Sequence, residues 1–99
     1  MSYKLILKTN ASIEIEDVIA YYSKINISIA KKLEVEIRNA FELVCKNPES
    51  FQYRYFNVRI CWLDKFPYGI YYIFEKDEVF ILAFWHQKED IEDKISQIL

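Results

Sequence analysis

Two segments in the second half of this 99-residue chain carry apolar side chains on both of their alternating faces. In residues 70–75 one face has Ile70, Tyr72 and Phe74, and the other has Tyr71 and Ile73. Residues 79–86, VFILAFWH, share this property. Successive side chains of a strand point to opposite sides of a sheet, so both sides of these strands are expected to be buried. Burying one large apolar side chain contributes about 1.5–3 kcal/mol, which makes a bare second face costly.

The residues before these segments predict a strand and a helical hairpin. Residues 3–8, YKLILK, alternate in part and indicate a strand. Apolar residues then recur at helical spacing over 11–25, with Thr9 or Asn10 as the expected N-cap. A second amphipathic helix is expected to follow, with Ser28 as its cap.

Three strands and a short helix are expected after the hairpin. Residues 55–63, YFNVRICWL, indicate a strand with one face more polar than the other. The turn DKFPYG, which contains the only glycine, leads into residues 70–75, and KDE makes a tight hairpin to residues 79–86. Isoleucines at helical spacing after Asp90 predict a short tail helix. This order indicates one α+β domain over residues 1–99: an N-terminal strand, a helical hairpin, a three-strand antiparallel meander that completes a sheet, and a C-terminal helix.

A helical hairpin covers only one face of so small a sheet, so the second face needs another cover. The alternatives are a partner chain, a second copy of this chain, and the tail helix. Because the tail is short, the sequence favours a partner.

Composition and motifs exclude several functional classes. The formal net charge of −2 argues against a generic nucleic-acid-binding domain. The N-terminal MSYKLILKTN does not resemble a signal peptide, and no apolar run is long enough to span a bilayer. We therefore expect a cytoplasmic protein in which Cys45 and Cys61 are reduced. The sequence lacks a Gly-rich phosphate loop, a metal-ligand pattern and a Ser-His-Asp order, so neither a metal nor a cofactor is expected.

Several local motifs, taken together and in order, resemble the RelE/ParE family of bacterial toxins. These motifs are Ala11 with Tyr21-Tyr22, Asn47-Pro48-Glu49-Ser50-Phe51, Val58-Arg59, Lys65-Phe66-Pro67-Tyr68 with Tyr71-Tyr72, and residues 81–88, ILAFWHQK. They cover nearly the whole chain. The resemblance implies a compact toxin of a type II toxin–antitoxin system whose sheet is embraced by a cognate antitoxin.

The resemblance implies one of two targets. RelE-like members cut mRNA in the ribosome without a metal, using basic and His or Tyr side chains, whereas ParE-like members bind DNA gyrase. The Phe-Pro-Tyr turn and the His-Gln-Lys ending are closer to the ParE branch. Where that branch usually has an arginine, this chain has Glu89, and residues 76–93 hold six acidic side chains against two basic ones. Such a rim repels RNA, so the sequence favours a ParE-like toxin. The alternatives are a RelE-like ribosome-dependent endoribonuclease and a degenerate family member that only binds the antitoxin.

The expected site residues fall into two groups. Catalysis, if present, is expected from Arg59, His86 and Lys88; target or antitoxin binding is expected from Arg54, Tyr55, Lys65, Tyr71 and Trp85. Each has a plainer alternative: Arg59 as a network arginine, His86 as a strand-end histidine that holds a backbone carbonyl, and the tyrosines and tryptophan as core or interface anchors. The expected partners are the antitoxin and gyrase or the mRNA-bound ribosome, in a homodimer or a toxin–antitoxin hetero-oligomer, and not a membrane.

Overall fold

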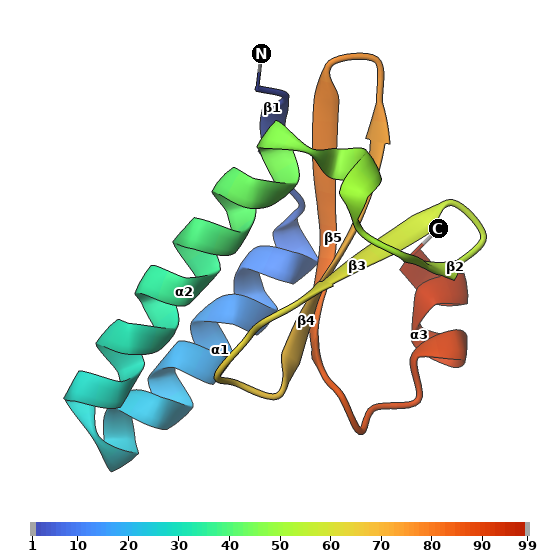
Figure 1. Ribbon diagram of the computed structural model, residues 1–99. Helices are drawn as coiled ribbons and strands as arrows, with labels where there is room; N and C mark the ends of the chain where they lie inside the picture. Colours follow the sequence, from blue (N-terminus) through green and yellow to red (C-terminus); the bar gives the residue numbers. More distant parts are fainter. Residues whose placement is uncertain (1, 99) are drawn as a thin grey trace.

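A five-stranded mixed sheet lies between a helical hairpin and a short C-terminal helix in the computed structural model, which describes residues 2–98 (Figure 1). The sheet order is β1-β5-β4-β3-β2, with β1 parallel to β5 and every other pair antiparallel. The elements are β1 (Lys4–Leu7), α1 (Thr9–Ile25), α2 (Ile27–Lys46), the 3-10 turn η1 (Pro48–Ser50), β2 (Tyr53–Tyr55), β3 (Val58–Trp62), β4 (Tyr68–Glu75), β5 (Glu78–His86) and α3 (Ile91–Ile98). The predicted α+β class and the antiparallel meander, which is β3-β4-β5, are confirmed.

Asn26, rather than Ser28, caps α2. The Asn26 side-chain oxygen accepts hydrogen bonds from the backbone N–H groups of Ser28 at 2.9 Å and Ile29 at 3.4 Å. The same residue ends α1, because its own N–H donates to the carbonyl of Tyr22 at 2.8 Å. Asparagine is among the best N-cap residues, and here it joins two helices with no intervening loop.

The N-terminus of α1 also differs from the prediction. Its N-cap is Lys8, and no side chain caps the helix there. Asn10 instead donates from its side-chain amide to the carbonyl of Leu82 on β5, at 2.7 Å. Pairing of β1 with β5 stops at Ile81, so the α1 side chain satisfies a sheet-edge carbonyl that lies beyond the end of β1.

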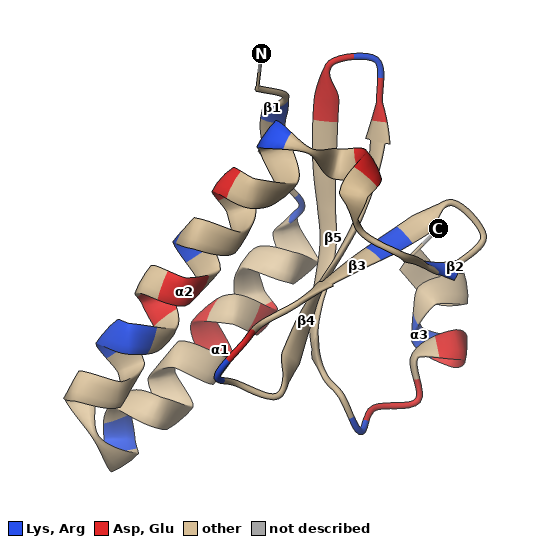
Figure 2. Cartoon of the chain, in the orientation of Figure 1, with Lys and Arg blue, Asp and Glu red and all other residues tan. Residues whose placement is uncertain are grey.

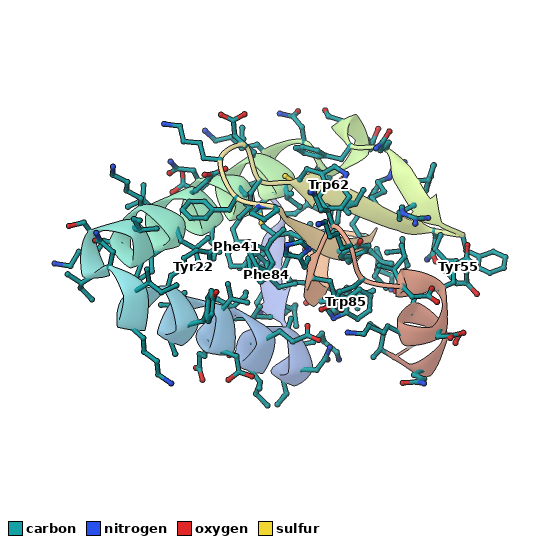
Figure 3. The ribbon with its side chains drawn as sticks, turned by 90° about the horizontal axis from the view of Figure 1, so that it is seen from below. Tyr22, Phe41, Tyr55, Trp62, Phe84 and Trp85 are labelled. Carbon is teal, nitrogen blue, oxygen red and sulfur yellow. The ribbon has the colours of Figure 1, made fainter. Side chains whose placement is uncertain are left out.

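The hairpin of α1 and α2 covers one face of the sheet. The core beneath it takes Ile70 and Tyr72 from β4, Val79, Ile81 and Phe84 from β5, and the buried stripes of both helices. Figure 3 shows Tyr22, Phe41 and Phe84 gathered between these helices and the sheet. The predicted division of residues 70–75 into two apolar faces is confirmed, because Tyr71 and Ile73 pack on the other side.

Helix α3 covers the second face, so the prediction that a partner chain would cover it is wrong. Ile91 and Ile95 are buried against a core of sheet residues, namely Val58, Ile60, Tyr71, Leu82, Ala83 and Trp85. Two turns of helix suffice because Ile91, Ile95 and the half-buried Ile98 align on one side of α3. In Figure 3, Trp85 lies between the sheet and this helix.

Two irregularities in the sheet were not predicted. The segment expected as a single strand over 55–63 is divided by a tight turn at Phe56 and Asn57, so β2 and β3 form a hairpin. In β5, a bulge at Leu82 lets both Leu82 and Ala83 face α3.

Gly69, expected in a turn, lies inside β4, where the Trp62 ring and Ile60 leave no room for a Cβ atom.

Two absences hold for residues 2–98. No helix there is long and apolar enough to cross a membrane. In the same range no group of three or more His, Cys, Asp or Glu residues is placed to hold a metal ion. Cys45 and Cys61 are buried free thiols.

Candidate binding surfaces

Arg59 fastens the segment that follows α2 to the sheet. Its Nη1 donates to the carbonyls of Glu49 at 3.0 Å and Phe51 at 2.6 Å, and its Nη2 donates to the hydroxyl of Tyr53 at 2.7 Å. The guanidinium carbon lies 3.9 Å from the ring centroid of Tyr53 and 5.6 Å from that of Phe74. Few of its donors remain for a phosphate or a carboxylate from outside, an arrangement typical of a network arginine.

His86 lies at the end of β5, away from Arg59. Its Nδ1 accepts a hydrogen bond from the backbone N–H of Lys88 at 3.1 Å, and its ring meets that of Tyr68 edge-on at 5.1 Å. His86 is opposite Tyr68 on β4, whereas Arg59 is opposite Tyr72, four residues farther along that strand. At about 3.3 Å per residue, this places them roughly 13 Å apart along the sheet. The three residues predicted to be catalytic are therefore not brought to one point.

Acidic side chains surround the end of β5. Figure 2 shows Asp and Glu along the loop after β5 and on the start of α3. They are Glu89, Asp90, Glu92 and Asp93, and Glu89 forms an ion pair with Lys94. The His86–Lys88 segment thus lies beside carboxylates, which oppose the approach of a polyanion.

The Phe-Pro-Tyr turn packs onto the helical hairpin. Phe66 meets Tyr22 edge-on at 5.5 Å, and Tyr68 stacks on Phe84 at 5.1 Å. Burial, reinforced by the neighbouring Tyr22, raises the pKa of Tyr68 to about 12. Tyr68 therefore stays a neutral phenol, and the turn supports the fold rather than presenting a reactive group.

Tyr71 and Trp85, both predicted to bind a partner, are buried beneath α3, with 1% and 3% of their surface exposed. Their ring centroids are 5.0 Å apart, and the ammonium group of Lys94 on α3 lies 5.6 Å from the ring centroid of Trp85. Burial raises the pKa of Tyr71, against the opposing charge of Arg54. With α3 in place, neither aromatic residue can touch another molecule.

Lys65 lines a groove between α2 and the loop from β3 to β4. The groove has a volume of about 730 Å³, and its lining comprises Ile29, Lys31, Lys32, Val35, Glu36, Asn39, Lys65 and Phe66. The Glu36 carboxylate accepts hydrogen bonds from the backbone N–H groups of Asp64 and Lys65, which holds the loop against the helix. Val35 is 50% exposed there. The lining combines apolar side chains with three lysines and one glutamate, and of these residues the sequence predicted only Lys65.

Arg54 and Tyr55 lie on β2, at the edge of the sheet. Arg54 is exposed, and the half-buried Tyr55 meets the ring of Phe56 edge-on at 4.6 Å. Phe56 is 80% exposed, although sequence patterning placed it in a strand face. Asn57, a common turn residue, was the one sequence signal for this hairpin.

The family model described as the ParE toxin of type II toxin-antitoxin system, parDE, matches residues 5–91. A solved structure described as the chromosomal ParDE TA system from P. aeruginosa has the same fold, with a TM-score of 0.73 at 17% identity, over 86% of this chain and 96% of that one. No curated protein sequence matches. The chain therefore belongs to the ParE toxin family of type II toxin–antitoxin systems.

Proposed function

We propose that this protein inhibits growth by binding a macromolecular target such as DNA gyrase, performs no bond-breaking chemistry of its own, and is neutralised by a cognate antitoxin. The observation that carries the proposal is the separation of the would-be catalytic residues. Arg59 donates to Glu49, Phe51 and Tyr53, and His86 lies at the other end of the paired strands. Acid–base catalysis needs such groups within hydrogen-bond reach of one reacting centre.

Exposed apolar side chains give independent support for a binding role. Several large apolar side chains of the helical hairpin are at least half exposed, namely Tyr21, Ile25, Ile27 and Val35. The same holds for Tyr53 and Phe56 on the β2–β3 hairpin. Grouped apolar side chains that remain exposed are a feature of protein–protein contact sites, so these two groups support a binding role. The acidic loop after β5 disfavours RNA as the partner.

The test is induction of the chain in a bacterial host, alone and together with the products of the neighbouring reading frames. We expect growth arrest with intact mRNA, inhibition of purified gyrase in a supercoiling assay, and co-purification of one neighbouring product that restores growth. The variants His86→Ala and Lys88→Ala are expected to arrest growth as the wild type does. Cleaved mRNA would instead identify a RelE-like endoribonuclease, and unimpaired growth with antitoxin bound would identify a degenerate binding module.

A further inference from the structure

The turn between β2 and β3 holds a phenylalanine in a backbone conformation that phenylalanine rarely adopts. Phe56 is the first of the two turn residues and has φ of 49°. This left-handed region suits glycine or asparagine, because a Cβ atom there crowds the neighbouring carbonyl oxygen. Phe56 is also 80% exposed, so its ring gains little from burial within this chain. The edge-on contact with Tyr55 at 4.6 Å leaves most of the ring exposed, so neither the turn nor the core accounts for an aromatic residue here.

The other tight hairpin of the chain provides an internal comparison. Lys76 is the first residue of the two-residue turn between β4 and β5, and its φ is 53°. That position carries an exposed, charged side chain instead of an aromatic one. The fold thus tolerates a polar residue at the same turn position with the same backbone conformation.

The surroundings of Phe56 have the composition of a protein-binding site. Residues 53–56, here called the β2–β3 tip, are Tyr-Arg-Tyr-Phe, and Tyr53 is 60% exposed. Residues 51–63 contain two arginines and no carboxylate, in a chain whose net charge is −2. In Figure 2, β2 and β3 carry the blue of Lys and Arg and none of the red of Asp and Glu. Aromatic residues and arginine dominate the energetic centres of protein interfaces.

We propose that the β2–β3 tip inserts Phe56 into an apolar pocket of a protein partner whose rim carries carboxylates, with Arg54 facing those carboxylates. This inference rests on the proposed function, and the partner is the target that the toxin inhibits. A single-stranded nucleic acid is a poorer fit, because it needs several free cations along its backbone and Arg59 is already engaged by Glu49, Phe51 and Tyr53. A symmetric dimer through the tip would bring Arg54 and Arg59 against their own copies.

The test compares Phe56→Asn with two controls. Lys76→Asn makes the same backbone change on the other hairpin, and Phe56→Tyr keeps an aromatic ring. Because asparagine adopts left-handed backbone readily, both asparagine variants are expected to keep or raise the Tm. We expect Phe56→Asn to weaken growth arrest at least about tenfold in colony counts under induction, as for loss of one interface hot spot. Both controls are expected to arrest growth fully, and Arg54→Glu to weaken arrest while Arg54→Lys does not.

Several outcomes would overturn the inference. Growth arrest by Phe56→Asn equal to that of the wild type would remove the β2–β3 tip as a target contact while leaving the proposed function intact. Phe56-dependent binding of a single-stranded RNA 20-mer, measured by fluorescence anisotropy, would replace the protein partner by RNA. Dimerisation that depends on Phe56, measured by sedimentation velocity, would identify the partner as a second copy of this chain. If Phe56→Asn lowers the Tm, Phe56→Lys, which copies the β4–β5 turn, takes its place. Absence of arrest by the wild type removes the proposed function and this inference together.

Discussion

The carboxylate of Glu14 on α1 accepts a hydrogen bond from the indole Nε1–H of Trp85 on β5 at 2.5 Å. The same carboxylate accepts one from the backbone N–H of Phe84 at 3.1 Å. With Asn10 bound to the carbonyl of Leu82, side chains one helical turn apart on α1 pair with the edge of β5 beyond the end of β1. Side chains of α1 thus satisfy the backbone groups of β5 that β1 is too short to reach, and Glu14 also orients Trp85, which packs under α3.

Removal of the Glu14 carboxylate is expected to destabilise the fold. Glu14→Ala leaves two part-buried N–H donors without partners, and hydrogen bonds to a charged group are each worth about 1.5–3 kcal/mol. We expect the free energy of unfolding to fall by roughly 2–3 kcal/mol in urea titrations. Glu16→Ala, an exposed neighbour on the same helix, is the matched control, with an expected effect of about 0.5 kcal/mol or less. Equal effects of the two variants would rule out the edge-pairing role.

Arg59 is expected to act on stability. Arg59→Ala removes three hydrogen bonds that hold the carbonyls of Glu49 and Phe51 and the hydroxyl of Tyr53. Because the partners include backbone carbonyls, the loss is expected to be about 2–3 kcal/mol and to speed protease cleavage near η1. Arg54→Ala, an exposed arginine on the adjacent strand, should leave both the unfolding midpoint and the cleavage rate unchanged. A stable, protease-resistant Arg59→Ala variant would show that the network is dispensable.

Gly69 is expected to resist substitution because of close packing, not because of turn geometry. A Cβ atom at this position would lie 2.6 Å from Cδ1 of Ile60 and 2.9 Å from two atoms of the Trp62 ring. Overpacking of this kind costs about 1–3 kcal/mol, which should appear as a lower Tm for Gly69→Ala. Ile60→Val removes the clashing methyl group, so the double variant should be less destabilised than the sum of the single ones. Strict additivity would contradict this packing explanation.

Alkaline pH is expected to weaken the fold through Cys61. Burial, with a smaller contribution from the negative charge of Glu36, raises the pKa of Cys61 from its ordinary value of 9.0 to about 11. Between these values the unfolded chain loses the thiol proton while the folded chain keeps it, so stability falls as pH rises. A rise of two pKa units corresponds to about 2.7 kcal/mol at most, of which about 2 kcal/mol is lost by pH 10.5. Urea midpoints measured at pH 7, 9 and 10.5 should fall, and less steeply in Cys61→Ala; an identical slope in the variant would exclude this thiol.

The sequence predicted the parts of the fold that depend on regular alternation. Residues 70–75 divide between the two cores as predicted, because β4 has no irregularity of its own. In β5 the extra residue at Leu82 shifts the alternation of side chains by one position. No glycine or other residue typical of a bulge indicates this shift in the sequence. The β2–β3 turn was missed because its first residue is Phe56. Its left-handed backbone conformation is usually adopted by glycine or asparagine, so a phenylalanine there does not indicate a turn.

The candidate site was less predictable than the fold. Glu14 and Trp85 are 71 residues apart, and nothing in their local sequence indicates their contact. The short tail led to the prediction that Tyr71 and Trp85 face a partner. In the structure Ile91 and Ile95 of α3 bury both residues. The binding roles of Arg54, Tyr55 and Lys65 stay predictions.

Mapping of mRNA ends in a translation extract tests most directly whether this ParE-family toxin acts without chemistry. The purified wild-type chain is added to an extract that translates a defined mRNA, and 5′ ends are located by primer extension, with His86→Ala as the matched variant. The separation of Arg59 from His86 predicts that no new ends appear with either protein. New ends produced by the wild type and lost in His86→Ala would contradict the account.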